Sequence, residues 1–88
     1  MSDDEIQNLR QRIAEQDRAV LDAVNARLRL VAELKSVKTG RGVPFADPEQ
    51  EERLLAVLEA ANAGPLSSDG LRTLFREILA LTKRELAD

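Results

Sequence analysis

The sequence predicts an all-α protein with one long N-terminal helix and two shorter helices, and two observations lead to this fold class. Apolar residues recur at helical spacing through three segments, the first from about Asp4 to Lys38 and the other two after Gly40. No segment shows the alternation of apolar and polar residues that is typical of a strand. The pattern therefore predicts helices alone.

The first expected helix runs from about Asp4 to Lys38, and the sequence has no proline or glycine before Gly40. Such a helix is about 50 Å long, whereas a compact globule of 88 residues is roughly 30 Å across. Its apolar stripe would be exposed in a monomer, so we expect an intertwined homodimeric helical bundle. The stripe comprises Ile6, Leu9, Ile13, Val20, Val24, Leu30, Val31, Leu34 and Val37.

Three cations, Arg10, Arg27 and Lys38, lie on or near this stripe and are candidate ligands for an anion. Arg27 takes a heptad position that is otherwise apolar, and a buried arginine is costly unless an anion or a hydrogen-bonding partner compensates it. Arg27 and Lys38 share one helix face with Cα atoms about 16 Å apart, which leaves room for a small dianion. Arg10 lies roughly 25 Å from Arg27 in a straight helix. It can serve the same site only from a second, antiparallel subunit.

The second expected helix begins at an Asp47-Pro48-Glu49-Gln50 pattern. Asp47 is the predicted N-cap, Pro48 the first helical residue, and Gln50 completes a capping box. Gly64-Pro65 is expected to end the helix. Its predicted buried face comprises Leu54, Leu55, Val57, Leu58 and Ala61.

The third expected helix has Ser67 as its N-cap, and Leu66 and Leu71 stand at the spacing of a hydrophobic staple. We expect residues 1–88 to form a single helical domain, because the chain is too short for a second one. The helical period continues to the end of the chain through Leu71, Leu74, Phe75, Ile78, Leu79, Thr82 and Leu86.

Composition excludes several kinds of chemistry. The sequence lacks Cys, His, Trp and Tyr, which excludes disulfides, Cys/His zinc sites, thiol catalysis and histidine acid–base catalysis. With 13 basic and 16 acidic residues, the chain is mildly acidic, which argues against nucleic acid as the main partner. No segment has the features of a signal peptide or of a bilayer span, so we expect no membrane association and a soluble cytoplasmic protein.

Four segments together match a known family. They are LRQRIAEQD at 9–17, NARLRLVAELKSVK at 25–38, GVPFADPEQEERLL at 42–55 and GPLSSDGLRTLFREIL at 64–79. In this order and spacing, the sequence closely resembles the AroQ-class chorismate mutases. The resemblance implies an intertwined helical homodimer with two active sites, each completed by an arginine of the other subunit. It also implies the Claisen rearrangement of chorismate to prephenate in phenylalanine and tyrosine biosynthesis, with no metal or cofactor.

The resemblance implies a role for each matching residue. Arg10 of the partner subunit and Arg27 bind substrate carboxylates, and Lys38 donates a hydrogen bond to the ether oxygen. Asp47, through its backbone, and Glu51 engage the ring hydroxyl. Such a site would hold the flexible dianion in its reactive conformer and stabilise the charge that develops on the ether oxygen.

At three further positions, the residue of this chain can be compared with the type that the family has there. Thr82 falls where the family has a small polar residue near a substrate carboxylate. Gln50 falls at a substrate-binding position that is commonly Arg. Leu86 falls where the family has Gln or Glu as the second donor to the ether oxygen, and loss of one such donor lowers the rate by roughly 10²–10³. We therefore expect an active but slow mutase. The cations Arg53, Lys83 and Arg84 differ in helical phase from Leu86, so we do not expect them to replace that donor.

Several candidates also have a structural interpretation. Arg27 can pair with a carboxylate across a dimer and fix its register, and Lys38 complements the dipole of the first helix. Asp47 and Gln50 are explained as caps, and Glu51 is favoured in a first helical turn by the same dipole effect.

Two alternative functions stay open. A lyase that removes pyruvate from isochorismate would use similar cations on a similar dianion. A helical module with low intrinsic activity, which docks on another shikimate-pathway enzyme, is favoured by Gln50 and Leu86. The chain could also be one domain of a longer bifunctional protein, although Met1 and the short acidic start lead us to expect a free-standing form.

Overall fold

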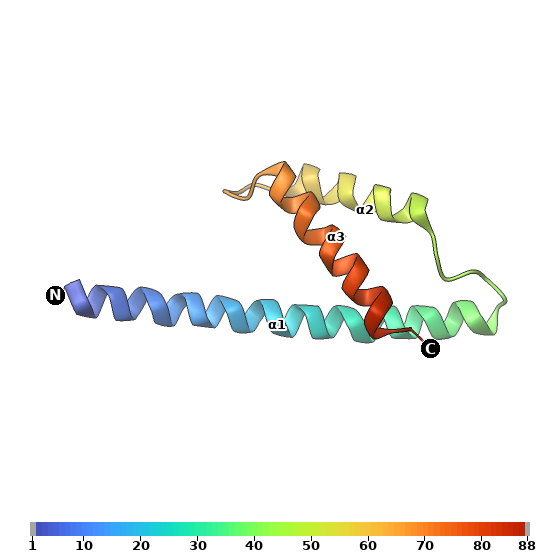
Figure 1. Cartoon of the computed structure of the whole chain (residues 1–88), viewed down its shortest axis with the longest axis horizontal. Coiled ribbons are helices and arrows are strands. Elements are labelled where there is room, and N and C mark those ends of the chain that lie inside the picture. Colours follow the sequence, from blue (N-terminus) through green and yellow to red (C-terminus); the bar gives the residue numbers. More distant parts are fainter. Residues whose placement is uncertain (1, 88) are drawn as a thin grey trace. The chain divides into compact units, whose positions relative to one another are not determined.

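The structure, a computed structural model, describes residues 2–87. It contains three helices in this part of the chain, α1 (Ser2–Gly40), α2 (Pro48–Ala61) and α3 (Ser68–Glu85), and no strand (Figure 1). The all-α prediction of one long and two shorter helices is confirmed. The described residues divide into two units, 2–30 and 31–87, and α1 runs through both. Each unit is considered by itself.

Helix α1 is slightly longer at both ends than its sequence pattern predicts. Its first turn is acidic and its last turn contains Lys38, which suits the helix dipole at each end. Beyond the helix, Gly42 has a φ of 69°, a left-handed conformation that glycine adopts without strain. The amide of Gly42 donates to the Thr39 carbonyl at 3.2 Å, and that of Val43 to the Lys38 carbonyl at 2.8 Å. These are the two bonds of a Schellman motif, which turns the chain back after α1.

Helix α2 begins as predicted. The Asp47 side chain accepts a hydrogen bond from the Gln50 amide at 3.1 Å, and Pro48 is the first helical residue. The prediction that Gln50 completes a capping box is wrong, because Gln50 Oε1 instead accepts a hydrogen bond from Arg53 Nε at 3.1 Å.

Helix α2 ends at Ala61, three residues before the predicted stop at Gly64-Pro65. Asn62 is extended, and its side chain donates to the Leu66 carbonyl at 2.8 Å and accepts from the Gly64 amide at 3.1 Å. Asparagine ends the helix because its side chain offers the neighbouring backbone alternative hydrogen bonds.

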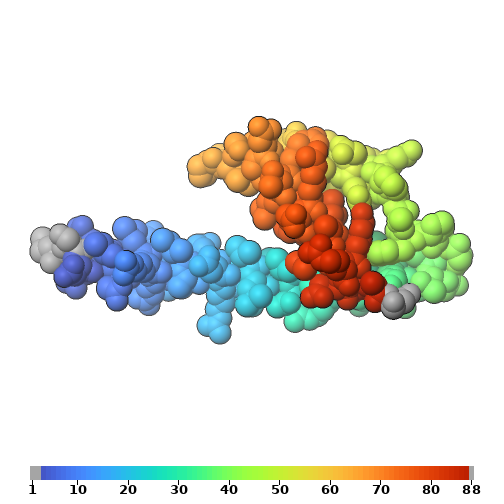
Figure 2. Space-filling view, in the orientation of Figure 1, coloured from blue at the N-terminus to red at the C-terminus, as the bar shows by residue number. Residues whose placement is uncertain are grey.

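Helices α2 and α3 pack against each other in the unit 31–87, and Figure 2 shows their side chains in contact. Leu55 of α2 and Leu71 of α3 are the buried apolar residues of the described chain, at 2 % and 4 % exposure. Of the predicted buried face of α2, Leu54 and Leu58 are half-buried, but Val57 is 65 % exposed and Ala61 is exposed. The face that contacts α3 is therefore narrower than the sequence pattern predicts.

A cation on α3 adds a polar contact between the same two helices. Arg72 forms an ion pair with Glu59 and a second one with Glu52, at 3.6 Å. The hydrogen bond and the charge of Glu59 raise the pKa of Arg72.

Helix α3 begins at the predicted N-cap, where Ser67 Oγ accepts from the Gly70 amide at 2.9 Å. It ends at Glu85, and the Leu86 amide donates to the Thr82 carbonyl at 3.0 Å. Leu86 is thus the C-cap rather than a residue of the helix itself.

Candidate functional site

The predicted site residues fall into both units of the chain. Arg10, which is exposed, and Arg27, which is half-buried, belong to the unit 2–30. Their meeting with the other candidates in one site, and the donation of Arg10 by a second subunit, stay predictions. The candidates of the unit 31–87 can be placed against one another through α2, α3 and the last turns of α1.

Lys38 is half-buried near the end of α1, and the loop that follows the Schellman motif returns to it. Its ammonium donates to the Phe45 carbonyl at 3.4 Å and lies 6.0 Å from the centre of the Phe45 ring. Attraction between the cation and the ring face restrains a side chain that is otherwise flexible. Phe45 therefore restrains Lys38, which is half-buried, and the role of Lys38 in binding an anion stays a prediction.

Glu51 lies in the first turn of α2 and is also held. Its Oε1 is 2.9 Å from Lys83 Nζ on α3, and the two side chains are 32 % and 57 % exposed. From the sequence alone, Lys83 is not expected to take part in the site. The structure gives it a different contact, with a carboxylate that is itself a candidate.

The side chains of Asp47 and Gln50 both make hydrogen bonds at the start of α2. The Asp47 carboxylate caps the helix, and the contact of its backbone with a ligand stays a prediction. Gln50 is exposed and bound to Arg53 of its own helix. The structural interpretation of Gln50 as a residue of the helix start therefore has direct support, although its predicted capping-box bond is replaced.

Thr82 is buried, at 6 % exposure, and its hydroxyl donates to the Ile78 carbonyl one turn earlier at 2.7 Å. It precedes Lys83, so the last turns of α3 carry both Thr82 and the partner of Glu51.

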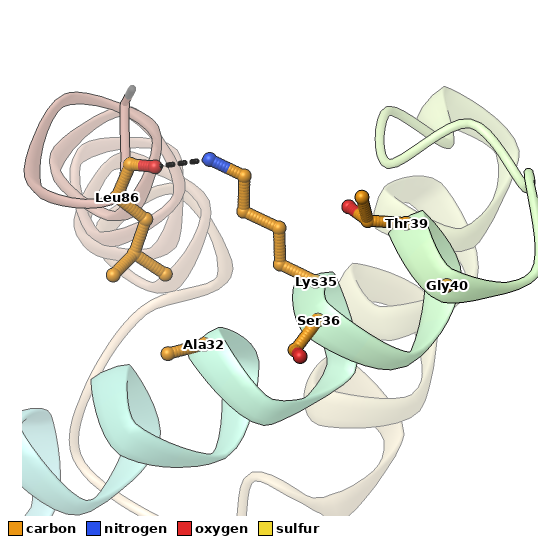
Figure 3. A pocket seen from close by; sticks show the side chains of 6 residues that line it. All are labelled: Ala32, Lys35, Ser36, Thr39, Gly40 and Leu86. Carbon is orange, nitrogen blue, oxygen red and sulfur yellow. Dashed lines mark hydrogen bonds between the residues drawn. The ribbon is translucent and has the colours of Figure 1, made fainter.

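Leu86 lines an open pocket of about 530 Å³ (Figure 3). The figure shows its backbone carbonyl oxygen facing the ammonium of Lys35, to which it is hydrogen-bonded. Lys35 also lies 5.9 Å from the centre of the Phe45 ring. The pocket is lined by Ala32, Lys35, Ser36, Thr39, Gly40 and Leu86.

Lys35 is not predicted as a functional residue from the sequence. Its spacing of three residues from Lys38 indicates a shared side of α1, but nothing in the sequence shows that the end of α3 reaches that side. The contact joins residues that are 51 positions apart.

The arrangement in the unit 31–87 provides cations, a paired carboxylate and a buried hydroxyl. Among the described residues, no group of His, Cys, Asp or Glu side chains could hold a metal ion. No described helix is both long and apolar enough to cross a membrane. The cations and the hydroxyl of this unit are groups that can form hydrogen bonds with an anionic ligand and stabilise its charge.

Comparison with known proteins gives one family. The chorismate mutase type II family matches residues 9–86. The chain is 34 % identical over 82 residues to a bifunctional chorismate mutase/prephenate dehydratase of Stutzerimonas stutzeri, covering 88 % of this chain and 22 % of that protein. It is 41 % identical over 78 residues to the T-protein of Enterobacter agglomerans, covering 83 % and 21 %. The chain thus spans about a fifth of the length of these curated relatives.

Two solved structures are also similar. Form II of chorismate mutase from Thermus thermophilus has a TM-score of 0.85 and 38 % identity, over 89 % of each chain. Form I of the same protein has a TM-score of 0.86 and 38 % identity, over 89 % of this chain and 98 % of that one. The likeness therefore extends over nearly the whole of a solved chain.

Proposed function

We propose that this chain, which belongs to the chorismate mutase type II family, catalyses the rearrangement of chorismate to prephenate. The observation that carries the proposal is the match of residues 9–86 to the family, at 38 % identity to a chorismate mutase over 89 % of both chains. The held cation Lys38 and the paired carboxylate Glu51 support it.

The reaction is intramolecular, so the demands on the protein are limited. The ether C–O bond breaks as a new C–C bond forms, and no atom, proton or electron is exchanged with the enzyme. A site can accelerate such a step by holding the substrate in its compact conformer. It can also place donors where negative charge develops on the ether oxygen. A chain without Cys or His has the side chains for both tasks.

The cations divide these tasks between them. Arg27 and Arg10 of a second copy bind the two carboxylates, since a guanidinium matches a carboxylate with two parallel hydrogen bonds. Lys38 donates to the ether oxygen, and its contact with Phe45 limits the rotamer freedom lost on binding.

The polar residues of α2 and α3 orient the ring. Glu51 accepts a hydrogen bond from the ring hydroxyl, and Lys83 holds its carboxylate for that purpose. The Asp47 backbone contacts the same hydroxyl, while its side chain fixes the start of α2. Thr82 lies near a substrate carboxylate, and Gln50 stands at the edge of the site.

The proposed active form is an intertwined homodimer. Most of the apolar stripe in the unit 2–30 is exposed, with Ile13 at 59 % exposure, and a stripe of this kind is typical of an interface. The relatives that carry the name of a bifunctional enzyme suggest a further partner. We propose that the domain formed by residues 1–88 can also work beside another enzyme of aromatic amino-acid synthesis, in the cytoplasm.

The test is an assay of purified protein with chorismate, in which substrate loss, prephenate and pyruvate are quantified in the same samples. The proposal predicts one prephenate for each chorismate consumed, and no pyruvate. Pyruvate from isochorismate, without prephenate from chorismate, would identify a lyase instead. No turnover until a second shikimate-pathway enzyme is added would identify a dependent module.

A further inference from the structure

Lys35 provides a polar tie between α1 and the end of α3. Its half-buried side chain extends to the Leu86 carbonyl, as Figure 3 shows. Leu86 is the C-cap of α3, where carbonyl groups lack a partner within the helix and the helix dipole is negative. An ammonium group satisfies both conditions. The contact is thus a cation at a helix C-terminus, supplied by a different helix.

The tie continues through backbone bonds to candidate site residues. The Leu86 amide donates to the Thr82 carbonyl at 3.0 Å, which closes the last turn of α3. The same turn contains Lys83, whose ammonium is paired with Glu51 at 2.9 Å. Restraint of Leu86 by Lys35 therefore restrains the turn that carries Thr82 and Lys83.

At its other end the tie begins one turn from Lys38. The ammonium groups of Lys35 and Lys38 lie 5.9 Å and 6.0 Å from the centre of the same ring, that of Phe45. The short stretch of α1 that presents Lys38 also holds α3.

Little apolar packing is available to take the place of this tie. The space between α1 and Leu86 is the open pocket of about 530 Å³. The wall that α1 contributes, apart from Lys35 itself, consists of the short side chains Ala32, Ser36 and Thr39 and of Gly40. Short side chains contribute few dispersion contacts across a gap. The long side chain of Lys35 spans it.

We propose that Lys35 is a positioning residue of the active site. Its ammonium fixes the last turn of α3 against α1, and so holds Thr82 and the Lys83–Glu51 pair in place relative to Lys38. The catalytic part of this inference rests on the proposed function, whereas the tie itself does not.

Three variants test the tie. Lys35→Met removes the ammonium and keeps most of the stem, Lys35→Arg keeps a cationic donor, and Arg84→Met removes an exposed cation from the same last turn of α3. Amide hydrogen exchange by NMR is measured at Leu86 and, as an internal reference, at buried Leu71. We expect Lys35→Met to speed exchange at Leu86 relative to Leu71, and the other two variants to leave that ratio within about twofold of the parent.

The same variants are assayed with chorismate. We expect kcat/KM to fall roughly tenfold to hundredfold in Lys35→Met, because small displacements of orienting groups have effects of this size. Lys35→Arg should restore most of the loss, and Arg84→Met should stay within about twofold. If Lys35→Met does not fold, as judged by circular dichroism, Lys35→Gln takes its place as the variant without charge.

Three results would overturn the inference. Unchanged exchange at Leu86 in Lys35→Met would show that Lys35 does not hold the end of α3. Faster exchange with unchanged kcat/KM would show that Lys35 has no positioning role in catalysis. Lost activity with unchanged exchange would make Lys35 a substrate ligand instead. If the parent protein does not convert chorismate at all, the proposed function fails, and the exchange measurement still decides whether the tie exists.

Discussion

At the scale of single residues, the candidate side chains are of two kinds. Some are already used in hydrogen bonds within their own helix, and others are partly exposed and can meet a ligand. Gln50 is bound to Arg53, and the Asp47 carboxylate is bound to the start of α2. Lys38 and Glu51 are each held by one neighbour while partly exposed. Leu86 makes hydrogen bonds through its backbone amide and carbonyl, and its side chain has no donor. We therefore expect the ether oxygen to have a single donor, Lys38, and the lack of a second donor to limit the rate.

Leu86→Gln tests this limit. The substitution adds a side-chain donor and leaves the carbonyl that binds Lys35 in place. We expect kcat to rise at least about tenfold, a part of the 10²–10³ that one such donor can contribute. Leu86→Met, of similar size and without a donor, is the matched control. A glutamine variant no faster than the methionine variant would show that this position does not limit the reaction.

At the scale of the helices, much of the fold could be predicted because its signals are local. The caps at Asp47 and Ser67 depend on hydrogen bonds to residues three positions away, and the sequence indicates both. The end of α2 was predicted wrongly because Asn62 competes with the glycine–proline signal through its side chain. The tie from Lys35 to Leu86 and the pair of Glu51 with Lys83 depend on packing between helices. No local pattern predicts such contacts.

The end of α1 gives a prediction at this scale. Gly42→Ala forces a side chain into a left-handed conformation, so we expect the free energy of unfolding to fall by about 1–2 kcal/mol. Gly40→Ala is the matched control, because that residue is helical and a Cβ there would meet no atom within 4 Å. It should change stability little or raise it by up to about 1 kcal/mol.

Urea unfolding with a common m-value measures both glycine variants. Equal stability of the two would contradict the Schellman motif as the element that ends α1.

At the scale of the whole molecule, the proposed active site requires more than one chain. Most of the apolar stripe in the unit 2–30 is exposed, and the buried core of the described single chain is small. Each proposed site therefore depends on residues of two copies, with Arg10 supplied by the second.

Complementation tests the shared site. Arg10→Ala and Lys38→Met should each be nearly inactive. Refolded together as an equal mixture, they form heterodimers in which one of the two sites has both residues intact. Since random pairing makes half of the dimers heterodimers, we expect about a quarter of the parent activity to return. Mixtures that stay inactive, although light scattering shows dimers, would place Arg10 outside the partner's site.

The proposed conversion of chorismate to prephenate depends above all on Lys38. Prephenate formation from chorismate is therefore compared for the parent protein, for Lys38→Met and for Arg76→Met, which removes an exposed cation from α3. We expect the parent and Arg76→Met to form prephenate at similar rates, and Lys38→Met to be slower by at least about 10². A Lys38→Met variant that turns over at the parent rate, or a parent that forms no prephenate, would contradict this proposal.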